Sequence, residues 1–134
     1  MVELESRPRV LAADDDAAFG AVVVQLVDAA PGLECLGVVS SGEAAVEKCD
    51  ELEPDIVLMD VVMPGIGGIG AARKIKESRS SIVVVLISTT HPDDLPREAS
   101  ECHADEIVWK AELRPALLEE IWRRHRPVHR TATP

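Results

Sequence analysis

Three acidic residues, a hydroxyl and a lysine stand at the ends of apolar segments that lie far apart in the sequence. Asp14 and Asp15 follow "RVLAA", Asp60 ends "DIVLMD", Ser88 ends "SIVVVLIS" and Lys110 ends "EIVWK". A carboxylate in an apolar setting is costly unless it has a partner, a cation or a chemical role. Asp60 is the most informative of the five, because a lone acid that closes "IVLM" has no local structural reason.

Brought together, these side chains could carry out phosphoryl chemistry. Closely packed carboxylates repel one another unless a cation neutralises them, and a set of carboxylate oxygens with room for water suits Mg²⁺. Asp60 is then a candidate nucleophile towards phosphorus, with Lys110 and Ser88 taking up the remaining charge. Taken singly, Asp14 and Asp16 also have an ordinary interpretation, because either could cap the helix that follows them.

The chain alternates between short β-branched runs and amphipathic segments. Strands are expected at residues 9–13, 33–39, 55–60, 81–88 and 106–110. Helices are expected at residues 18–30, 40–52, 69–78, 92–102 and 114–125. Ser40 and Glu43 have the spacing of a capping box, Pro115 suits a first helical turn, and Pro96 makes the fourth helix the weakest.

Strands that are apolar on both faces and alternate with helices form a parallel sheet covered on both sides. The predicted fold is therefore α/β: a five-stranded doubly wound parallel sheet, flavodoxin-like, of order 2-1-3-4-5, with five helices. In such a sheet the ligand site lies at the carboxyl ends of the strands. This rule brings Asp14, Asp15, Asp60, Ser88 and Lys110 to one edge, although they are scattered along the chain.

Composition and charge narrow the class of protein. The 134 residues are 46% hydrophobic and 28% charged, which fits one soluble globular domain. No apolar run has the roughly eighteen residues of a membrane span, and the N-terminus lacks the apolar core of a secretory signal, so we expect a cytoplasmic protein without membrane contact. A net charge of −10 speaks against direct binding to nucleic acid. Cys35, Cys49 and Cys102 have no metal-ligand spacing and are expected to be free thiols.

Five motifs, in order, carry a resemblance to a known family: "VLAADDDAAF", "GVVSSGEAAVE", "PDIVLMDVVMPGIGGI", "VVVLIST" and "VWKAELRPALLEEIW". From about Pro8 to Arg124 the chain resembles the receiver domains of bacterial two-component response regulators, in particular those of the NarL/LuxR type. The resemblance implies a phosphorelay protein in which Asp60 accepts a phosphoryl group from a sensor histidine kinase, with Mg²⁺ as cofactor.

The resemblance also implies a role for each residue of the cluster. The metal ligands would be carboxylates and one backbone carbonyl: Asp15 as the main ligand, Asp60, the carbonyl of Val62, and Asp14, directly or through water. Ser88 would be the switch hydroxyl and Lys110 the charge partner of the phosphoryl group. The chain departs from the family in having Ile107 at the switch-aromatic position, Trp109 before the lysine and Gly67 where an aspartate is frequent. We therefore expect a weaker activation switch.

The resemblance predicts a receiver domain at residues 1–126, followed by a tail or linker stump at residues 127–134 without an output domain. Such receivers normally regulate transcription through a DNA-binding domain. The chain would thus be either a stand-alone receiver that acts on another protein or the front part of a longer regulator, and a phosphorylation-linked dimer is a further implication. After Glu120 the chain has four arginines and no acid, which indicates a solvated tail or a stump of linker, with a basic docking patch as the alternative.

Two other classes of function compete with this interpretation. One is a protein-interaction module of the same fold that works without phosphorylation, which the intact set of Asp15, Asp60, Ser88 and Lys110 disfavours. The other is a small hydrolase with a phosphorylated enzyme intermediate. Such phosphatases usually carry a second acid two residues after the nucleophile, where this chain has Val62. We therefore expect no enzyme activity beyond the chain's own phosphorylation and dephosphorylation.

Overall fold

Five strands form one parallel sheet that positions the functional side chains. The computed structural model describes residues 7–127. The strands are β1 (Arg9–Ala13), β2 (Glu34–Val39), β3 (Ile56–Asp60), β4 (Val83–Ser88) and β5 (Glu106–Trp109). They lie in the order β2-β1-β3-β4-β5, and all pairs are parallel. This order confirms the predicted doubly wound, flavodoxin-like α/β fold.

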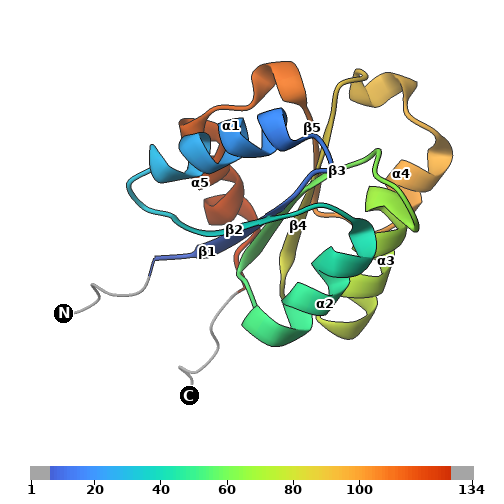
Figure 1. The fold of residues 1–134 in the computed structure, drawn as a ribbon, viewed down its shortest axis with the longest axis horizontal. Helices are drawn as coiled ribbons and strands as arrows, with labels where there is room; N and C mark the ends of the chain where they lie inside the picture. The colour runs from blue at the N-terminus through green and yellow to red at the C-terminus, as the bar shows by residue number, and fades with distance from the viewer. Residues whose placement is uncertain (1–6, 128–134) are drawn as a thin grey trace.

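Helices cover both faces of the sheet (Figure 1). On one face lie α1 (Ala17–Asp28) and α5 (Pro115–His125). On the other face lie α2 (Gly42–Leu52) and α3 (Gly67–Ser78), and the short α4 (Arg97–Glu101) precedes β5. The five predicted helices are therefore present, although their bounds differ from the expected ones.

Two apolar clusters, one on each face of the sheet, hold the layers together. Val57 and Met59 of β3 belong to the cluster under α2 and α3, whereas Ile56 and Leu58 belong to the cluster under α1 and α5. Every residue of β3 and β4 is buried. Burial on both faces explains why these two strands are almost continuous apolar runs in the sequence.

The start of α2 corrects the predicted capping box. Ser41, not Ser40, is the N-cap, and its Oγ accepts a hydrogen bond from the N–H of Ala44 at 3.1 Å. Glu43 does not turn back to its own helix. Its Oε2 accepts a hydrogen bond from the N–H of Ile66 at 3.1 Å, in the loop before α3. The box fails because the helix begins one residue later than expected: with Ser41 as the N-cap, Glu43 is the second helical residue and Ala44 takes the third position, where a capping box needs a Glu or Gln.

The segment predicted as one helix at residues 92–102 is divided in two. A 3₁₀ turn, η1 (Pro92–Asp94), is followed by α4, and Pro96 is the N-cap between them. Leu95 is extended, with ψ of 157°, as expected of a residue that precedes a proline. By contrast, α5 begins at Pro115 as predicted, because the first helical position needs no N–H donor.

One charged cluster ties the end of α5 to β5. Glu106 Oε2 lies 2.6 Å from His125 Nε2 and accepts a hydrogen bond from Arg124. Burial alone would raise the pKa of Glu106, but the hydrogen bonds from His125 and Arg124 outweigh it and lower that pKa below its usual value. Arg124 thus helps to anchor the end of α5 to β5.

Three further expectations concern the thiols, the membrane and the tail. All three cysteines are free thiols, as predicted, and burial raises the pKa of Cys49 to about 11. Between residues 7 and 127, no helix has both the length and the apolar character needed to cross a membrane. Of the predicted tail, only Pro127 belongs to the described residues; residues 128–134 lie outside them.

Candidate functional site

Three carboxylates meet at the carboxyl-terminal edge of the sheet. Asp14 and Asp15 follow β1, and Asp60 is the last residue of β3. One oxygen atom from each lies within 4.8 Å of the other two. Asp14 and Asp60 are only 3% and 8% exposed, whereas Asp15 is exposed to solvent. The structure thus brings the three acids together where the strand order places them.

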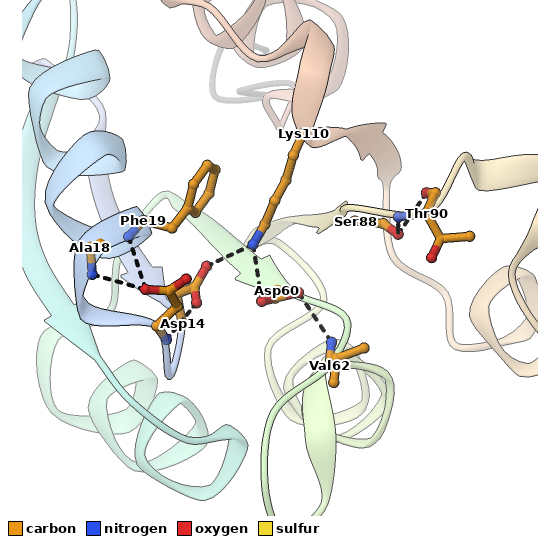
Figure 2. Close-up of polar contacts among 9 residues, drawn as sticks. Asp14, Ala18, Phe19, Asp60, Val62, Ser88, Thr90 and Lys110 are labelled. Carbon is orange, nitrogen blue, oxygen red and sulfur yellow. Dashed lines mark hydrogen bonds and ion pairs between the residues drawn. The ribbon is translucent and has the colours of Figure 1, made fainter.

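Lys110 lies between two of these acids. Its Nζ donates hydrogen bonds to Asp14 Oδ2 and to Asp60 Oδ2, each at 3.2 Å (Figure 2). The lysine side chain is 12% exposed, so this ion pair is largely withdrawn from water. One ammonium does not balance three carboxylates, and the cluster therefore remains acidic.

The environment of Asp60 makes its ionised form costly. Burial raises the pKa of Asp60 above its usual value, and the nearby Asp14 acts in the same direction. Hydrogen bonds from the N–H of Val62, at 3.1 Å to Oδ1, and from Lys110 act against this rise. An added cation would stabilise the carboxylate further, because it supplies the positive charge that the cluster lacks.

The third acid of "DDD" has a structural role. Asp16 is the N-cap of α1, and its Oδ1 accepts hydrogen bonds from the N–H groups of Ala18 and Phe19 at 3.0 and 3.3 Å. This confirms the helix-cap interpretation for Asp16. Asp14 also contributes locally, since its Oδ1 accepts a hydrogen bond from the N–H of Asp16 at 2.8 Å while its other oxygen binds Lys110.

The loop after β3 approaches the site closely and depends on glycines. A Cβ at Gly68 would lie 2.0 Å from the backbone oxygen of Asp60, so no larger residue fits there. Gly67 adopts φ of +72°, which an L-residue avoids. Val62, at the start of the loop, is 73% exposed.

Ser88 does not point its hydroxyl at the acids. Its Oγ donates a hydrogen bond to the carbonyl of Thr90 at 2.7 Å and accepts one from the N–H of Thr90 at 2.9 Å. Trp109 lies opposite Ser88 in the sheet, and its Nε1 donates a hydrogen bond to the carbonyl of Thr89 at 3.2 Å. The indole ring of Trp109, which we expected near the site, is therefore hydrogen-bonded to the loop that follows Ser88.

Two more residues complete the surroundings of the site. Ile107 is half-buried and packs against the apolar cluster under α2 and α3. Phe19 lies under Lys110, with the ammonium nitrogen 3.9 Å from the centre of its ring. The sequence analysis did not single out Phe19 and missed this contact.

The fold and this constellation together define a class of signalling protein. A doubly wound parallel sheet of order 2-1-3-4-5, with clustered acids and a lysine at its carboxyl edge, is the architecture of a receiver domain. The sequence profile of the response regulator receiver domain matches residues 10–122. The chain therefore belongs to the response regulator receiver domain family, as its sequence motifs predicted.

Named relatives agree with this assignment. The chain is similar to the response regulator GacA of Pseudomonas viridiflava, with 41% identity over 88 residues, which cover 66% of this chain and 41% of that protein. It is also similar to the response regulator UvrY of Escherichia coli strain K12, with 34% identity over 71% of this chain and 44% of that protein. The chain thus spans less than half the length of these curated relatives.

Solved structures show the same fold. The signal receiver domain of the response regulator NarL from Mycobacterium tuberculosis matches with a TM-score of 0.78 and 26% identity, over 87% of this chain and 98% of that chain. The response regulator domain of CheB from Thermotoga maritima matches with a TM-score of 0.77 and 30% identity, over 93% and 100% of the two chains. The predicted resemblance to NarL/LuxR-type receivers is confirmed.

Proposed function

We propose that this domain accepts a phosphoryl group on Asp60 from a sensor histidine kinase, with Mg²⁺ as cofactor, and that phosphorylation changes the proteins it binds. One observation carries the proposal. The Lys110 ammonium joins Asp14 to Asp60 at 3.2 Å from each, beside the exposed Asp15. A buried acid that is paired with a cation, next to an accessible acidic site, is equipped to receive a phosphoryl group.

Magnesium fits the donor set of this cluster. Mg²⁺ is bound by oxygen atoms, typically from one or two carboxylates, and keeps several of its waters. The residues that would hold it are the exposed Asp15, Asp60, the backbone carbonyl of Val62, and Asp14, directly or through water. When bound, the metal would neutralise charge on the phosphoryl oxygens.

Asp60, Lys110 and Ser88 would each have a separate role in phosphoryl transfer. An oxygen of Asp60 attacks the phosphorus of a kinase phosphohistidine, an O–P bond forms, and the P–N bond breaks with its electron pair remaining on the imidazole. Lys110 is already beside Asp60 and is placed to pair with the added charge. Ser88 would act as the switch hydroxyl. To donate to the phosphoryl group it must first give up its hydrogen bond to the Thr90 carbonyl.

The output of the signal is a protein contact. We assign residues 1–126 to the receiver and residues 127–134 to a tail or linker. The signal would pass either to a separate protein or to a DNA-binding domain of the same polypeptide, with a phosphorylation-linked dimer as one form of that contact. With a net charge of −10 this chain would not bind nucleic acid itself. The only reactions that the chain would catalyse are its own phosphorylation and dephosphorylation.

Mass spectrometry after incubation with acetyl phosphate and Mg²⁺ tests the proposal. We expect the addition of one phosphoryl group, no addition in Asp60→Asn, and no addition when EDTA removes the metal. Asp16→Asn is the matched control, because Asp16 caps α1 and does not belong to the acidic cluster. This variant should be phosphorylated like the wild type. Labelling of Asp60→Asn at the wild-type level would show that another residue is the acceptor.

A further inference from the structure

The ammonium group of Lys110 has three N–H donors, and the two carboxylates of Asp14 and Asp60 occupy only part of its surroundings. Another side of the ammonium lies over the face of Phe19, at 3.9 Å from the ring centre. Figure 2 shows the ring beside the lysine side chain. At this distance the negative face of the ring attracts the cation.

The position of this ring is set by the helix that carries it. Phe19 lies in the first turn of α1, where its N–H donates to the N-cap Asp16. The side chain is half-buried and packs against the apolar cluster under α1 and α5. It is the only phenylalanine of the chain. The ring is therefore held in place independently of the lysine.

We propose that Phe19 is a positioning residue that holds the Lys110 ammonium at the phosphoacceptor. This inference rests on the proposed function of Asp60. A ring face attracts a cation without the directional demand of a lone pair. Lys110 can therefore turn from a carboxylate oxygen towards an arriving phosphoryl oxygen while it stays over the ring. Without the ring, the long flexible side chain would sample positions away from the acceptor.

The contact between Phe19 and Lys110 also affects Mg²⁺ binding, and this effect is opposite in sign to its effect on phosphoryl transfer. Lys110 and a divalent cation compete for the oxygens of Asp14 and Asp60. A ring that holds the lysine in place therefore favours phosphoryl transfer but weakens the affinity for Mg²⁺. Removal of the ring should slow transfer and strengthen metal binding. A loss of general structural integrity would instead impair both.

Three variants separate these effects. Phe19→Leu keeps an apolar side chain of similar size but removes the ring face. Phe19→Tyr keeps the face and should behave like the wild type. Leu117→Ala is the control for packing, because Leu117 packs against the same apolar cluster and has no aromatic face to offer the ammonium.

The measurements are made on each variant in three steps. NMR shifts of the Lys110 ε-methylene protons report the ring current of Phe19. Titration with Mg²⁺ in the absence of a phosphodonor gives the metal affinity. The rate of phosphorylation by acetyl phosphate at saturating Mg²⁺ gives the transfer step. For Phe19→Leu we expect loss of the ring-current shift, Mg²⁺ binding that is tighter by about three- to tenfold, and transfer slower by a similar factor, the range of a partly buried cation–π contact.

Two outcomes would overturn the inference. If Phe19→Leu loses the ring-current shift while metal affinity and transfer rate stay unchanged, the ring lies near the lysine without acting on it. If affinity and rate fall together, as we expect for Leu117→Ala, the ring only supports the fold. If the wild type takes up no phosphoryl group, the proposed function fails, while the shift and the metal titration still decide whether Phe19 holds Lys110.

Discussion

Replacing Lys110 by methionine should destabilise the metal-free protein strongly. Methionine keeps most of the apolar stem of the lysine but removes its charge. Asp14 and Asp60, whose side chains are 1% and 11% exposed, then lose the cation that lies 3.2 Å from each of them. Both carboxylates would remain buried, without compensation and close together.

The magnitude follows from the geometry. Two unit charges 4.8 Å apart, the upper limit for the oxygens of this cluster, repel by about 3.5 kcal/mol at an effective dielectric constant of about 20, and by more at a shorter distance. Removing one partner of a buried ion pair costs about 3 to 5 kcal/mol. We therefore expect Lys110→Met to lower the free energy of unfolding by about 3 kcal/mol in EDTA. Excess Mg²⁺ should restore most of this loss, because the metal supplies positive charge at the same oxygens.

Urea denaturation followed by circular dichroism, with EDTA and with Mg²⁺, measures these differences. Lys48→Met is the matched control. Its partner Glu51 is 3.0 Å away, but the two side chains are 43% and 52% exposed, so that loss should stay below about 1 kcal/mol. Adding Asp60→Asn to Lys110→Met should recover stability, since it removes one of the two repelling charges. A loss for Lys110→Met no larger than that of the control, or one that Mg²⁺ does not reduce, would refute the electrostatic account of the cluster.

Three further predictions concern lifetime, pH and the switch. Val62→Asn should speed hydrolysis of the acyl phosphate by about three- to tenfold, because one hydrogen bond to the attacking water is worth about 1 kcal/mol. Mass spectrometry over time measures the decay, and a decay as slow as that of the wild type or slower would mean that another group holds the water. The pKa of Glu106 is lowered in the folded protein, so ionised Glu106 stabilises the fold. The wild type should therefore be more stable than Glu106→Gln above the ordinary pKa of a glutamate, and this advantage should disappear as the pH falls through the lowered pKa of Glu106. Urea denaturation across acidic pH measures the difference, and a difference that does not change with pH would mean that the contacts of Glu106 contribute nothing. Because Ile107 is β-branched and has no polar tip, a phosphoryl mimic should shift backbone amide NMR signals mainly in the loops after β3 and β4. Equally large changes across residues 106–118 would contradict this, and Ile107→Tyr should then make little difference.

The sheet could be predicted because its signal is local and repeated. β3 and β4 are buried on both faces, so their sequences are continuous apolar runs, and a polar residue marks the end of each. Once the strands were known, the rule for carboxyl ends of parallel strands placed Asp14, Asp60 and Lys110 at one edge without any side-chain coordinates. The contacts of Lys110 with the two acids, each at 3.2 Å, are the consequence of that placement.

What sequence reasoning missed depends on partners that are distant in the chain. Glu43 binds the N–H of Ile66 rather than its own helix, and no local pattern announces this. The hydroxyl of Ser88 is turned towards Thr90. This orientation depends on the rotamer of the side chain, whereas the sequence pattern predicts only where the residue lies in the sheet. Phe19 could have been found, because the first turn of the helix after β1 must lie at the same edge as Lys110.

Two of the aromatic residues lie at or near the acidic cluster, although the chain has few of them. The chain has one phenylalanine, two tryptophans and no tyrosine, so its core is aliphatic. A parallel sheet covered on both faces is filled well by Val, Ile and Leu, whose shapes suit the pleated surface. Of the three aromatic rings, Phe19 faces the Lys110 ammonium and Trp109 holds the loop after Ser88 through the Thr89 carbonyl. The face of an aromatic ring has a partial negative potential and tryptophan adds an N–H donor, so rings can attract a cation or donate a hydrogen bond where an aliphatic side chain can do neither. Phe19 and Trp109 thus lie at the edge of the acidic cluster and at its neighbouring loop, whereas Ile107 packs against the apolar cluster under α2 and α3.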